Sequence, residues 1–370
     1  MRILVAPDKF AGTLTAAQAA AAIAEGWRRT APDDECIPLP LSDGGPGFLD
    51  VLAGSLAGEL RTVPVTGPLG GQVPARLLLV DGGGTSTAYV ECADACGLHL
   101  VEPDRRDAEA ASTFGVGELL RAAVGAGASR VVVGVGGTAS TDGGAGMLAA
   151  LGATPREPLS SGGGGLGRLD DDGGTVDLAP ARAALDGVAL VAATDIGSPL
   201  MGSDGAAHGY GAQKGADRAA RERLEAAMRR WATATDGGVA VKAGAGAGGG
   251  LGFGLLLLGA ERVPGAQLVL DAVGLEARAA EADVVVTGEG AFDWQSLRGK
   301  VVAGVTRAAQ QSGRPVVVLA GRVEVGRREL SATGIDAAYA VVDMPGRDEG
   351  HTPYEGLATL AARVARTWSR

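Results

Sequence analysis

Residues Val131 to Met147, VVVGVGGTASTDGGAGM, indicate the fold class of this chain. The stretch begins with a run of valines, continues through glycines and hydroxyl side chains, and leads into a segment rich in alanine and leucine. An unbroken apolar run of this kind is typical of a parallel strand that is buried on both faces. The stretch therefore predicts a buried strand, a glycine turn and the start of a helix, which together indicate an α/β fold.

The glycine turn in this stretch has two interpretations. Backbone N–H groups at the carboxyl end of a strand, together with the positive end of the following helix dipole, can bind a phosphate or a carboxylate. A tight turn also needs glycine wherever φ is positive. One such turn favours the second interpretation, whereas the several similar turns in this chain favour the first. The binding candidates here are Gly136, Gly137, Thr138, Asp142, Gly143 and Gly144.

The composition limits the classes of function. The chain has 370 residues, enough for two domains, and 62 of them are glycine without a collagen-like period. Its net charge is −10, which argues against nucleic acid as a partner because an acidic surface repels phosphate backbones. Three cysteines give no basis for a disulfide framework and indicate a reducing cytoplasm. The uncharged stretch from Ala243 to Ala260 is interpreted as a glycine loop and a buried helix, not as a membrane span.

Charged or amide side chains follow several other predicted strands and one glycine loop. The further candidates are Asp8 and Lys9, then Ser42, Asp43 and Gly44, then Asp195, then Gln213 and Lys214, and finally Glu289, Asp293, Gln295 and Lys300. Ligands of open α/β sheets bind outside the carboxyl ends of the strands, so these residues are expected to share a site. Carboxylates without clusters of histidine and cysteine favour Mg²⁺ over zinc, and lysines among glycines favour phosphate. The combination predicts phosphoryl transfer.

Other patterns carry less information. Residues 244–249 match G-x-G-x-x-G, the pattern of a dinucleotide site. A chain so rich in glycine is expected to contain this match by chance, and no clear strand precedes it. Alternating segments over 61–65, 75–80 and 88–91 predict an antiparallel or mixed sheet and a domain boundary near residue 60. Residues 155–174 are expected to form a mobile surface loop, with a linker-like glycine run.

Seven motifs, taken together, resemble the bacterial glycerate kinase family. They are APDKFAGTLTA (6–16), PLSDGG (40–45), VTGPLG (65–70), VGGTASTDGGAGM (135–147), GAQKGA (211–216), GAGAGGGLG (244–252) and VVTGEGAFDWQSLRGK (285–300). They occur in the family's order and cover nearly the whole chain. The resemblance implies phosphorylation of D-glycerate to 2-phosphoglycerate with ATP and Mg²⁺, in a cleft between two α/β domains. It also implies a discontinuous Rossmann- or flavodoxin-like parallel-sheet domain over 1–60 and 280–370, and an inserted domain with a mixed sheet over 61–279.

Within this hypothesis, each charged residue is given a role. Asp195 or Asp293 is expected to orient the attacking hydroxyl, and Asp43 and Glu289 to serve the metal. Lys214 and Lys300 are expected to neutralise phosphate or the substrate carboxylate. The remaining candidates, including Gln213 and Gln295, are expected to bind substrate or nucleotide.

Two alternatives to a glycerate kinase stay open. One is a kinase for another small hydroxy acid, because Ala11 and Pro46 stand where the family usually has lysine and glutamate. The other is a non-catalytic relative that binds a nucleotide or a hydroxy acid. The expected partners are small molecules and not nucleic acid or membrane, and a homodimer is left open.

Overall fold

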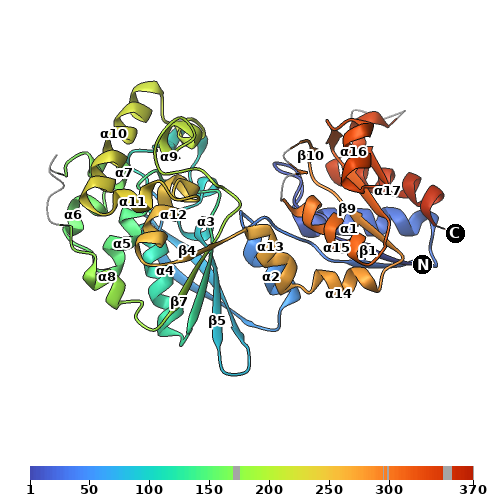
Figure 1. The fold of residues 1–370 in the computed structure, drawn as a ribbon, viewed down its shortest axis with the longest axis horizontal. Helices are drawn as coiled ribbons and strands as arrows, with labels where there is room; N and C mark the ends of the chain where they lie inside the picture. Colours follow the sequence, from blue (N-terminus) through green and yellow to red (C-terminus); the bar gives the residue numbers. More distant parts are fainter. Residues whose placement is uncertain (170–175, 295, 298–299, 345–351, 370) are drawn as a thin grey trace. The chain divides into compact units, whose positions relative to one another are not determined.

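The computed structural model describes residues 1–169, 176–294, 296, 297, 300–344 and 352–369. The chain folds into two compact units, which are described separately. Unit 1 comprises Met1–Asp43, Asp50–Leu56 and Gly265–Arg370 (Figure 1). Unit 2 comprises Gly44–Leu49 and Ala57–Pro264.

Three segments group differently from the expected boundaries. Residues 44–49 and 57–60 were expected in the first domain, whereas the structure groups them with unit 2. Residues 265–279 were assigned to the inserted domain by sequence, whereas the structure groups them with unit 1. The reason is helix packing: α13 (Gly265–Ala272) lies against α15 (Val301–Gln311). A Cβ at Gly304 would lie 2.2 Å from Cδ1 of Leu270, so the glycine in α15 allows the close approach.

Unit 1 contains a five-stranded parallel sheet in the order β13-β11-β9-β1-β2. Side chains on both faces of its central strands are buried, which explains their unbroken apolar runs. The strands are β1 (Arg2–Val5), β2 (Glu35–Pro38), β9 (Val284–Thr287), β11 (Val316–Ala320) and β13 (Ala337–Ala340).

The strand order of unit 1 contains a topological switch point. From β1 the chain first forms β2 on one side, and later forms β9, β11 and β13 in succession on the other side. This is the flavodoxin-like order, in which ligands bind at the carboxyl ends of the two strands flanking the switch. Here those strands are β1 and β9, and Asp8 and Glu289 follow them directly.

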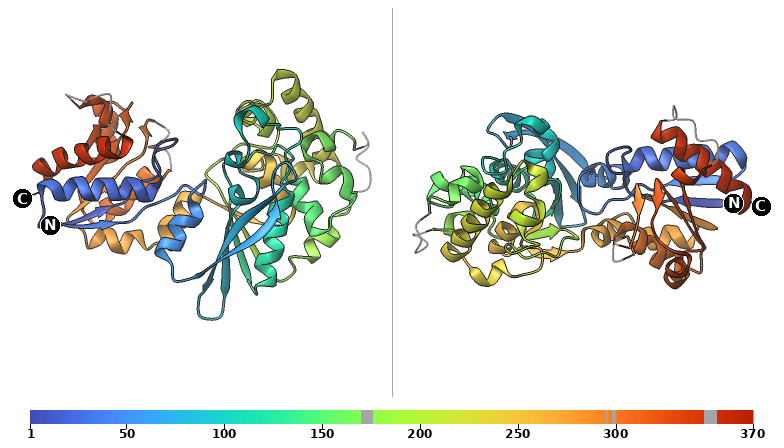
Figure 2. Two further views of the ribbon diagram at one scale, coloured as in Figure 1. Left: turned by 180° about the vertical axis from the view of Figure 1, so that it is seen from behind. Right: turned by 90° about the horizontal axis from the view of Figure 1, so that it is seen from above.

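The helices of unit 1 form around this sheet. The long helices α1 (Ala16–Thr30) and α17 (Pro353–Trp368) lie side by side (Figure 2). A capping box starts α1: the Thr15 hydroxyl accepts from the N–H of Gln18, and the Gln18 side chain accepts from the N–H of Thr15. The other described elements are α14 (Leu275–Ala280), α16 (Arg327–Thr333), η4 (Val341–Asp343), and the paired short strands β10 (Ala291–Phe292) and β12 (Arg322–Val323).

Unit 2 contains a six-stranded mixed sheet in the order β3-β4-β5-β6-β7-β8. The first three strands pair antiparallel, and β5 to β8 pair parallel. The strands are β3 (Glu59–Thr66), β4 (Gln72–Asp81), β5 (Ser86–Glu91), β6 (Arg130–Gly134), β7 (Ala189–Ala193) and β8 (Glu261–Val263). The predicted α/β fold with one parallel and one mixed sheet is confirmed, and β8 is a strand that the sequence pattern did not reveal.

The helices of unit 2 are mostly short. The two longest are α4 (Phe114–Gly125) and α10 (Arg218–Ala234). The others are α3 (Cys92–Cys96), α5 (Ala145–Leu151), α6 (Arg156–Leu159), α7 (Gly162–Leu166), α8 (Ala179–Ala183), α9 (Ala206–Tyr210), α11 (Gly237–Ala240), α12 (Ala247–Leu257), η1 (Leu98–Leu100), η2 (Pro103–Arg105) and η3 (Ala212–Lys214); α2 (Phe48–Ser55) carries residues of both units.

The expectation of a mobile loop over residues 155–174 is wrong for its described part. The segments Arg156–Leu159 and Gly162–Leu166 form α6 and α7, and the glycine run is largely buried. A Cβ at Gly163 would lie 2.1 Å from the carbonyl oxygen of Thr141, so this glycine lets α7 pack against the turn after β6. Residues 170–175 of the expected loop lie outside the described residues.

The uncharged stretch from Ala243 to Ala260 contains α12. Gly248, Gly249 and Gly250 all have positive φ at the start of this helix, a backbone course that other residues rarely follow. Among the helices of the described residues, none has both the length and the apolar character needed to cross a bilayer.

Candidate functional site

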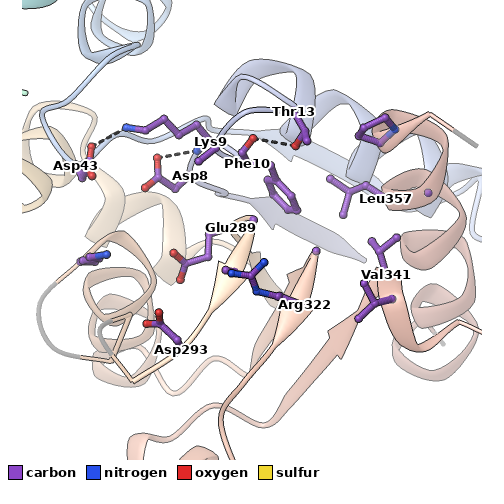
Figure 3. Close-up of a pocket in the computed structure, with 18 of the residues that line it drawn as sticks. Asp8, Lys9, Phe10, Thr13, Asp43, Glu289, Asp293, Arg322, Val341 and Leu357 are labelled. Carbon is purple, nitrogen blue, oxygen red and sulfur yellow. Dashed lines mark hydrogen bonds and ion pairs between the residues drawn. The ribbon is translucent and has the colours of Figure 1, made fainter. Parts of the chain in front are cut away.

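The carboxyl edge of the unit 1 sheet bounds a cavity of about 580 Å³, which we call the unit 1 cavity. Its lining comes from the turns after β1, β2, β9 and β11, from η4, and from the start of α17. Four carboxylates gather at one end of it (Figure 3). The predicted site residues that line it are Asp8, Lys9, Asp43, Glu289, Asp293 and Lys300.

Asp8 is the most deeply buried carboxylate of the cavity, with 8% of its surface exposed. Its Oδ1 accepts a hydrogen bond of 2.7 Å from the N–H of Lys9, whose ammonium pairs with Asp43 at 2.8 Å. The pKa of Asp8 is raised to about 7, mainly by burial and then by the charge of Asp43, while the charge and the N–H of Lys9 oppose the shift. Desolvation and a neighbouring like charge both disfavour the ionised carboxylate, and both act on Asp8.

Glu289 lies across the switch point on the turn after β9. Burial is the main cause that raises its pKa, while a hydrogen bond with Ser296 and the charge of Lys300 oppose the shift. Its Oε1 is buried and has no hydrogen-bond partner. A buried carboxylate oxygen without a donor is costly, so this atom fits an incoming cation.

The turn after β10 holds Asp293, another carboxylate of the cavity. The hydroxyl of Ser296, which is fully buried, donates to Oδ1 of Asp293 at 3.4 Å and accepts from the N–H of Asp293 at 3.2 Å. Lys300 is the residue that precedes α15. Gln295, another predicted binding residue, lies outside the described residues.

The donor set of this cavity fits Mg²⁺. Carboxylate oxygens are its usual protein ligands, and it often takes only one or two of them and completes its shell with phosphate and water. Among the side chains that the structure describes, no group of three or more Asp, Glu, His or Cys is spaced to hold a metal ion. The residues present therefore fit a metal that arrives with a phosphate ligand better than one held by protein alone.

The acid–base state of Asp8 leads to a testable stability effect. Its pKa in the folded state, about 7, lies above the ordinary aspartate value of 3.8 expected in the unfolded chain, so the folded protein binds more protons than the unfolded chain between these values. The free energy of unfolding therefore falls as pH rises through this window. Because one pKa unit corresponds to about 1.4 kcal/mol, Asp8→Asn should raise Tm by about 3 °C or more at pH 8 without divalent cations, and by less at pH 5.

Thermal unfolding at the two pH values measures the Asp8 effect. Asp33→Asn, at an exposed position, is the matched control and should leave Tm unchanged at both. An equal Tm change for Asp8→Asn at pH 5 and pH 8 would contradict the raised pKa.

In unit 2 the predicted residues lie mainly in the protein interior. Lys214 is buried, with 3% of its surface exposed, and its ammonium donates to the Thr138 hydroxyl at 3.0 Å and to the carbonyl oxygen of Ser140. Burial lowers its pKa to about 8. Lys214 therefore holds the turn after β6 from within.

Asp142 also supports this turn. It is fully buried, and its carboxylate accepts from the N–H and hydroxyl of Thr113 and from the N–H groups of Gly144 and Gly146. Burial is the main cause that raises its pKa, and these hydrogen bonds oppose the shift. The side chain ties the turn to the loop before α4.

The expectation that Gly143 and Gly144 donate to a phosphate does not fit their geometry. The N–H of Gly143 donates to the carbonyl oxygen of Gly249, and that of Gly144 donates to Asp142. Both have positive φ, and a Cβ at Gly143 would lie 2.6 Å from the Trp231 ring. These glycines satisfy the tight-turn interpretation because internal packing uses both of their donors.

The other candidates of unit 2 are placed as follows. A Cβ at Gly137, whose φ is positive, would lie 2.4 Å from the Pro46 ring, and one at Gly136 would lie 3.0 Å from Cα of Gly45. Asp195 is half-buried beyond β7, and Gln213 is exposed. Gly44 has a positive φ, and Ser42, in unit 1, is buried.

The packing around Lys214 predicts a large effect at Gly249. A Cβ there would lie 2.0 Å from the carbonyl oxygen of Ser140 and 2.7 Å from the Lys214 ammonium, and φ is +68°. We expect Gly249→Ala to lower the free energy of unfolding by about 3 kcal/mol, from backbone strain and overpacking together. Gly259→Ala has a similar φ of +86° and open space, so it should cost only about 1 kcal/mol. Urea unfolding of both variants tests this, and equal losses would refute the packing argument.

Three residues with roles near these sites were not among the candidates. Ser296 forms hydrogen bonds with Asp293 and Glu289, and Thr113 forms them with Asp142. Arg322 adds a cation to the unit 1 cavity. Serine, threonine and arginine are common surface residues, so nothing in their sequence context distinguishes them. Ser296 alone lies between candidates, because Gln295 precedes it and Lys300 follows four residues later.

Comparison with known proteins places the chain in a family. The model of the glycerate kinase family matches residues 3–369. A glycerate kinase of Halalkalibacterium halodurans is 39% identical over 100% of this chain and 99% of its own, and glycerate 2-kinase of Escherichia coli is 35% identical over 99% and 98%. The crystal structure of a proposed glycerate kinase 2 from Salmonella typhimurium LT2 matches with a TM-score of 0.78 and 37% identity, over 99% of this chain and 98% of that one. Similarity of this extent shows that the chain belongs to the glycerate kinase family and is a kinase.

Proposed function

We propose that this protein transfers the γ-phosphoryl group of ATP to a hydroxyl of D-glycerate and forms 2-phosphoglycerate. The observation that carries the proposal is the unit 1 cavity, where carboxylates and lysines meet at the switch point of a flavodoxin-like sheet. Membership of the glycerate kinase family supports the choice of acceptor. The name of the Escherichia coli relative, glycerate 2-kinase, supports the choice of product.

We propose that Asp43 and Glu289 hold Mg²⁺ when the nucleotide is bound. The ion supplies positive charge to the phosphate oxygens, which is the main requirement of phosphoryl transfer. The unpartnered Oε1 of Glu289 supports its assignment as a ligand. Lys9 keeps Asp43 in place through their ion pair of 2.8 Å.

The other charged residues are assigned by the demands of the reaction. Lys300 neutralises charge on the transferred phosphoryl group. Asp293, fastened by Ser296, orients the attacking hydroxyl and accepts its proton as the new P–O bond forms and the bond to ADP breaks. Asp195 is the alternative for this role. We assign Lys214 and Asp142 to positioning of the turn after β6, because protein groups already surround both side chains.

The function is tested with MgATP and D-glycerate in a coupled assay of ADP release, with the product identified by phosphorus NMR. A rate that depends on glycerate and yields 2-phosphoglycerate is expected. The same assay with other small hydroxy acids is the control for acceptor identity. If the folded protein phosphorylates only another hydroxy acid, that acid is the acceptor in place of glycerate. If the folded protein binds nucleotide but phosphorylates no acid, the proposal is refuted.

We also propose that the protein works in the cytoplasm. Its cysteines Cys36, Cys92 and Cys96 are free, buried thiols, which suits a reducing compartment.

A further inference from the structure

The unit 1 cavity has a second end with a different character. Apolar side chains line it, from the turn after β1, from η4 and from α17. Figure 3 shows Phe10, Val341 and Leu357 together at this end, apart from Asp8 and Asp43. Arg322 lies between the two ends (Figure 3). The cavity is thus charged at one end and apolar at the other.

The size of the cavity does not match a three-carbon acid alone. Its volume of about 580 Å³ falls in the range of about 300–1,000 Å³ that is typical of sites for drug-sized ligands. Glycerate carries a carboxylate and two hydroxyls on three carbons and has almost no apolar surface to bury. A nucleoside triphosphate combines an anionic chain with a flat ring system, as the two ends of this cavity require.

The apolar end also exposes side chains that a ligand would cover. Val342 in η4 is 51% exposed, and it is one of few large apolar residues so exposed among the described ones. It lines the cavity together with the exposed Pro353, while Phe10 and Leu357 beneath them are buried. Exposed apolar surface at a concave site is typical of ligand contact.

We propose that the apolar end of the unit 1 cavity binds the purine base of the phosphoryl donor, so that unit 1 is the nucleotide-binding unit. This inference rests on the proposed function. Phe10, Val341, Val342 and Pro353 contact the base, and Lys9 and Lys300 at the other end neutralise the phosphates. The ribose bridges the two ends beside Arg322, whose guanidinium is paired with Glu324 at 2.6 Å.

The test replaces Val342 with glutamate in the full chain. A carboxylate at this exposed position would repel the nucleotide and would present charge where an apolar base binds, without disturbing the core. Val241→Glu is the matched control, because Val241 is 72% exposed and belongs to unit 2. Calorimetric titration with MgADP and with magnesium pyrophosphate, together with steady-state kinetics, gives the readouts.

We expect Val342→Glu to raise the Kd of MgADP and the KM of MgATP at least tenfold, with the KM of glycerate changed less than twofold. Pyrophosphate, which has no base, should bind this variant within about threefold of the wild type. Val241→Glu should match the wild type in every measurement.

Three results would overturn the inference and are distinguishable from one another. If wild-type protein phosphorylates glycerate but Val342→Glu binds MgADP normally, the base lies elsewhere and the proposed function stands. If only the KM of glycerate rises, the apolar end serves the acceptor. If wild-type protein neither binds MgADP nor turns over ATP, the proposed function fails together with the inference.

Discussion

Lys300→Ala is expected to lower kcat/KM for glycerate phosphorylation by about 100- to 1,000-fold, the usual cost of removing one preorganised group that stabilises transition-state charge. Lys300 lines the unit 1 cavity at the start of α15, and its charge acts on Glu289 across the cavity. The lost charge matters most when negative charge shifts onto the transferred oxygens. The decrease should therefore appear mainly in kcat, with Tm within about 2 °C of the wild type.

The matched control for this prediction is Lys242→Ala. Lys242 is exposed and belongs to unit 2, so its loss removes the same net charge away from the cavity. Steady-state kinetics and thermal unfolding should both be unchanged. A normal kcat/KM for Lys300→Ala would show that this lysine takes no part in the reaction.

Glu289→Gln is expected to lower kcat by about 100-fold or more and to raise the Mg²⁺ concentration needed for half-maximal rate. The amide has the shape of the carboxylate but lacks the charge that holds a cation. Burial raises the pKa of Glu289, and its Oε1 lacks a donor, so the wild-type charge is destabilising in the absence of metal. The variant should consequently unfold at an equal or higher Tm than the metal-free wild type while losing activity.

Glu276→Gln is the matched control for Glu289→Gln, because Glu276 is exposed in the first turn of α14. Its kcat, its Mg²⁺ dependence and its Tm should match the wild type. If Glu289→Gln lost activity and Tm together, with no shift in Mg²⁺ dependence, the residue would have a structural role and not the proposed role in metal binding.

Local sequence patterns predicted the buried strands of the fold, because a strand that is buried on both faces consists of consecutive apolar residues. The valine run before Gly136 and the run over 283–287 correspond to β6 and β9, since strands covered on both faces need apolar residues throughout. The glycine run over 162–165 was misread for the converse reason. Glycine in a loop and glycine in a close helix contact look alike in sequence, and Gly163 is set apart only by its approach to Thr141.

The candidate site residues were also predicted correctly only in part. Chain position at strand ends identified Asp8, Asp43 and Glu289, and all three line one cavity because β1, β2 and β9 are neighbours in a parallel sheet. The same reasoning selected Asp142, and a glycine loop selected Lys214, but both side chains are buried among protein donors and acceptors. A position at the end of a strand determines where the backbone goes, but not which groups pack around the side chain.

The sequence alone therefore determined the α/β class, the parallel strands, their acidic and glycine-rich ends and, through its motifs, the resemblance to the glycerate kinase family. Only the tertiary structure decided which of these polar residues line a cavity and which hold a turn. Burial depends on segments distant in the chain, such as Thr113 against Asp142 and Gly249 against Lys214. The apolar end of the unit 1 cavity also depends on tertiary packing, because Phe10, Val342 and Leu357 meet only when β1, η4 and α17 pack together.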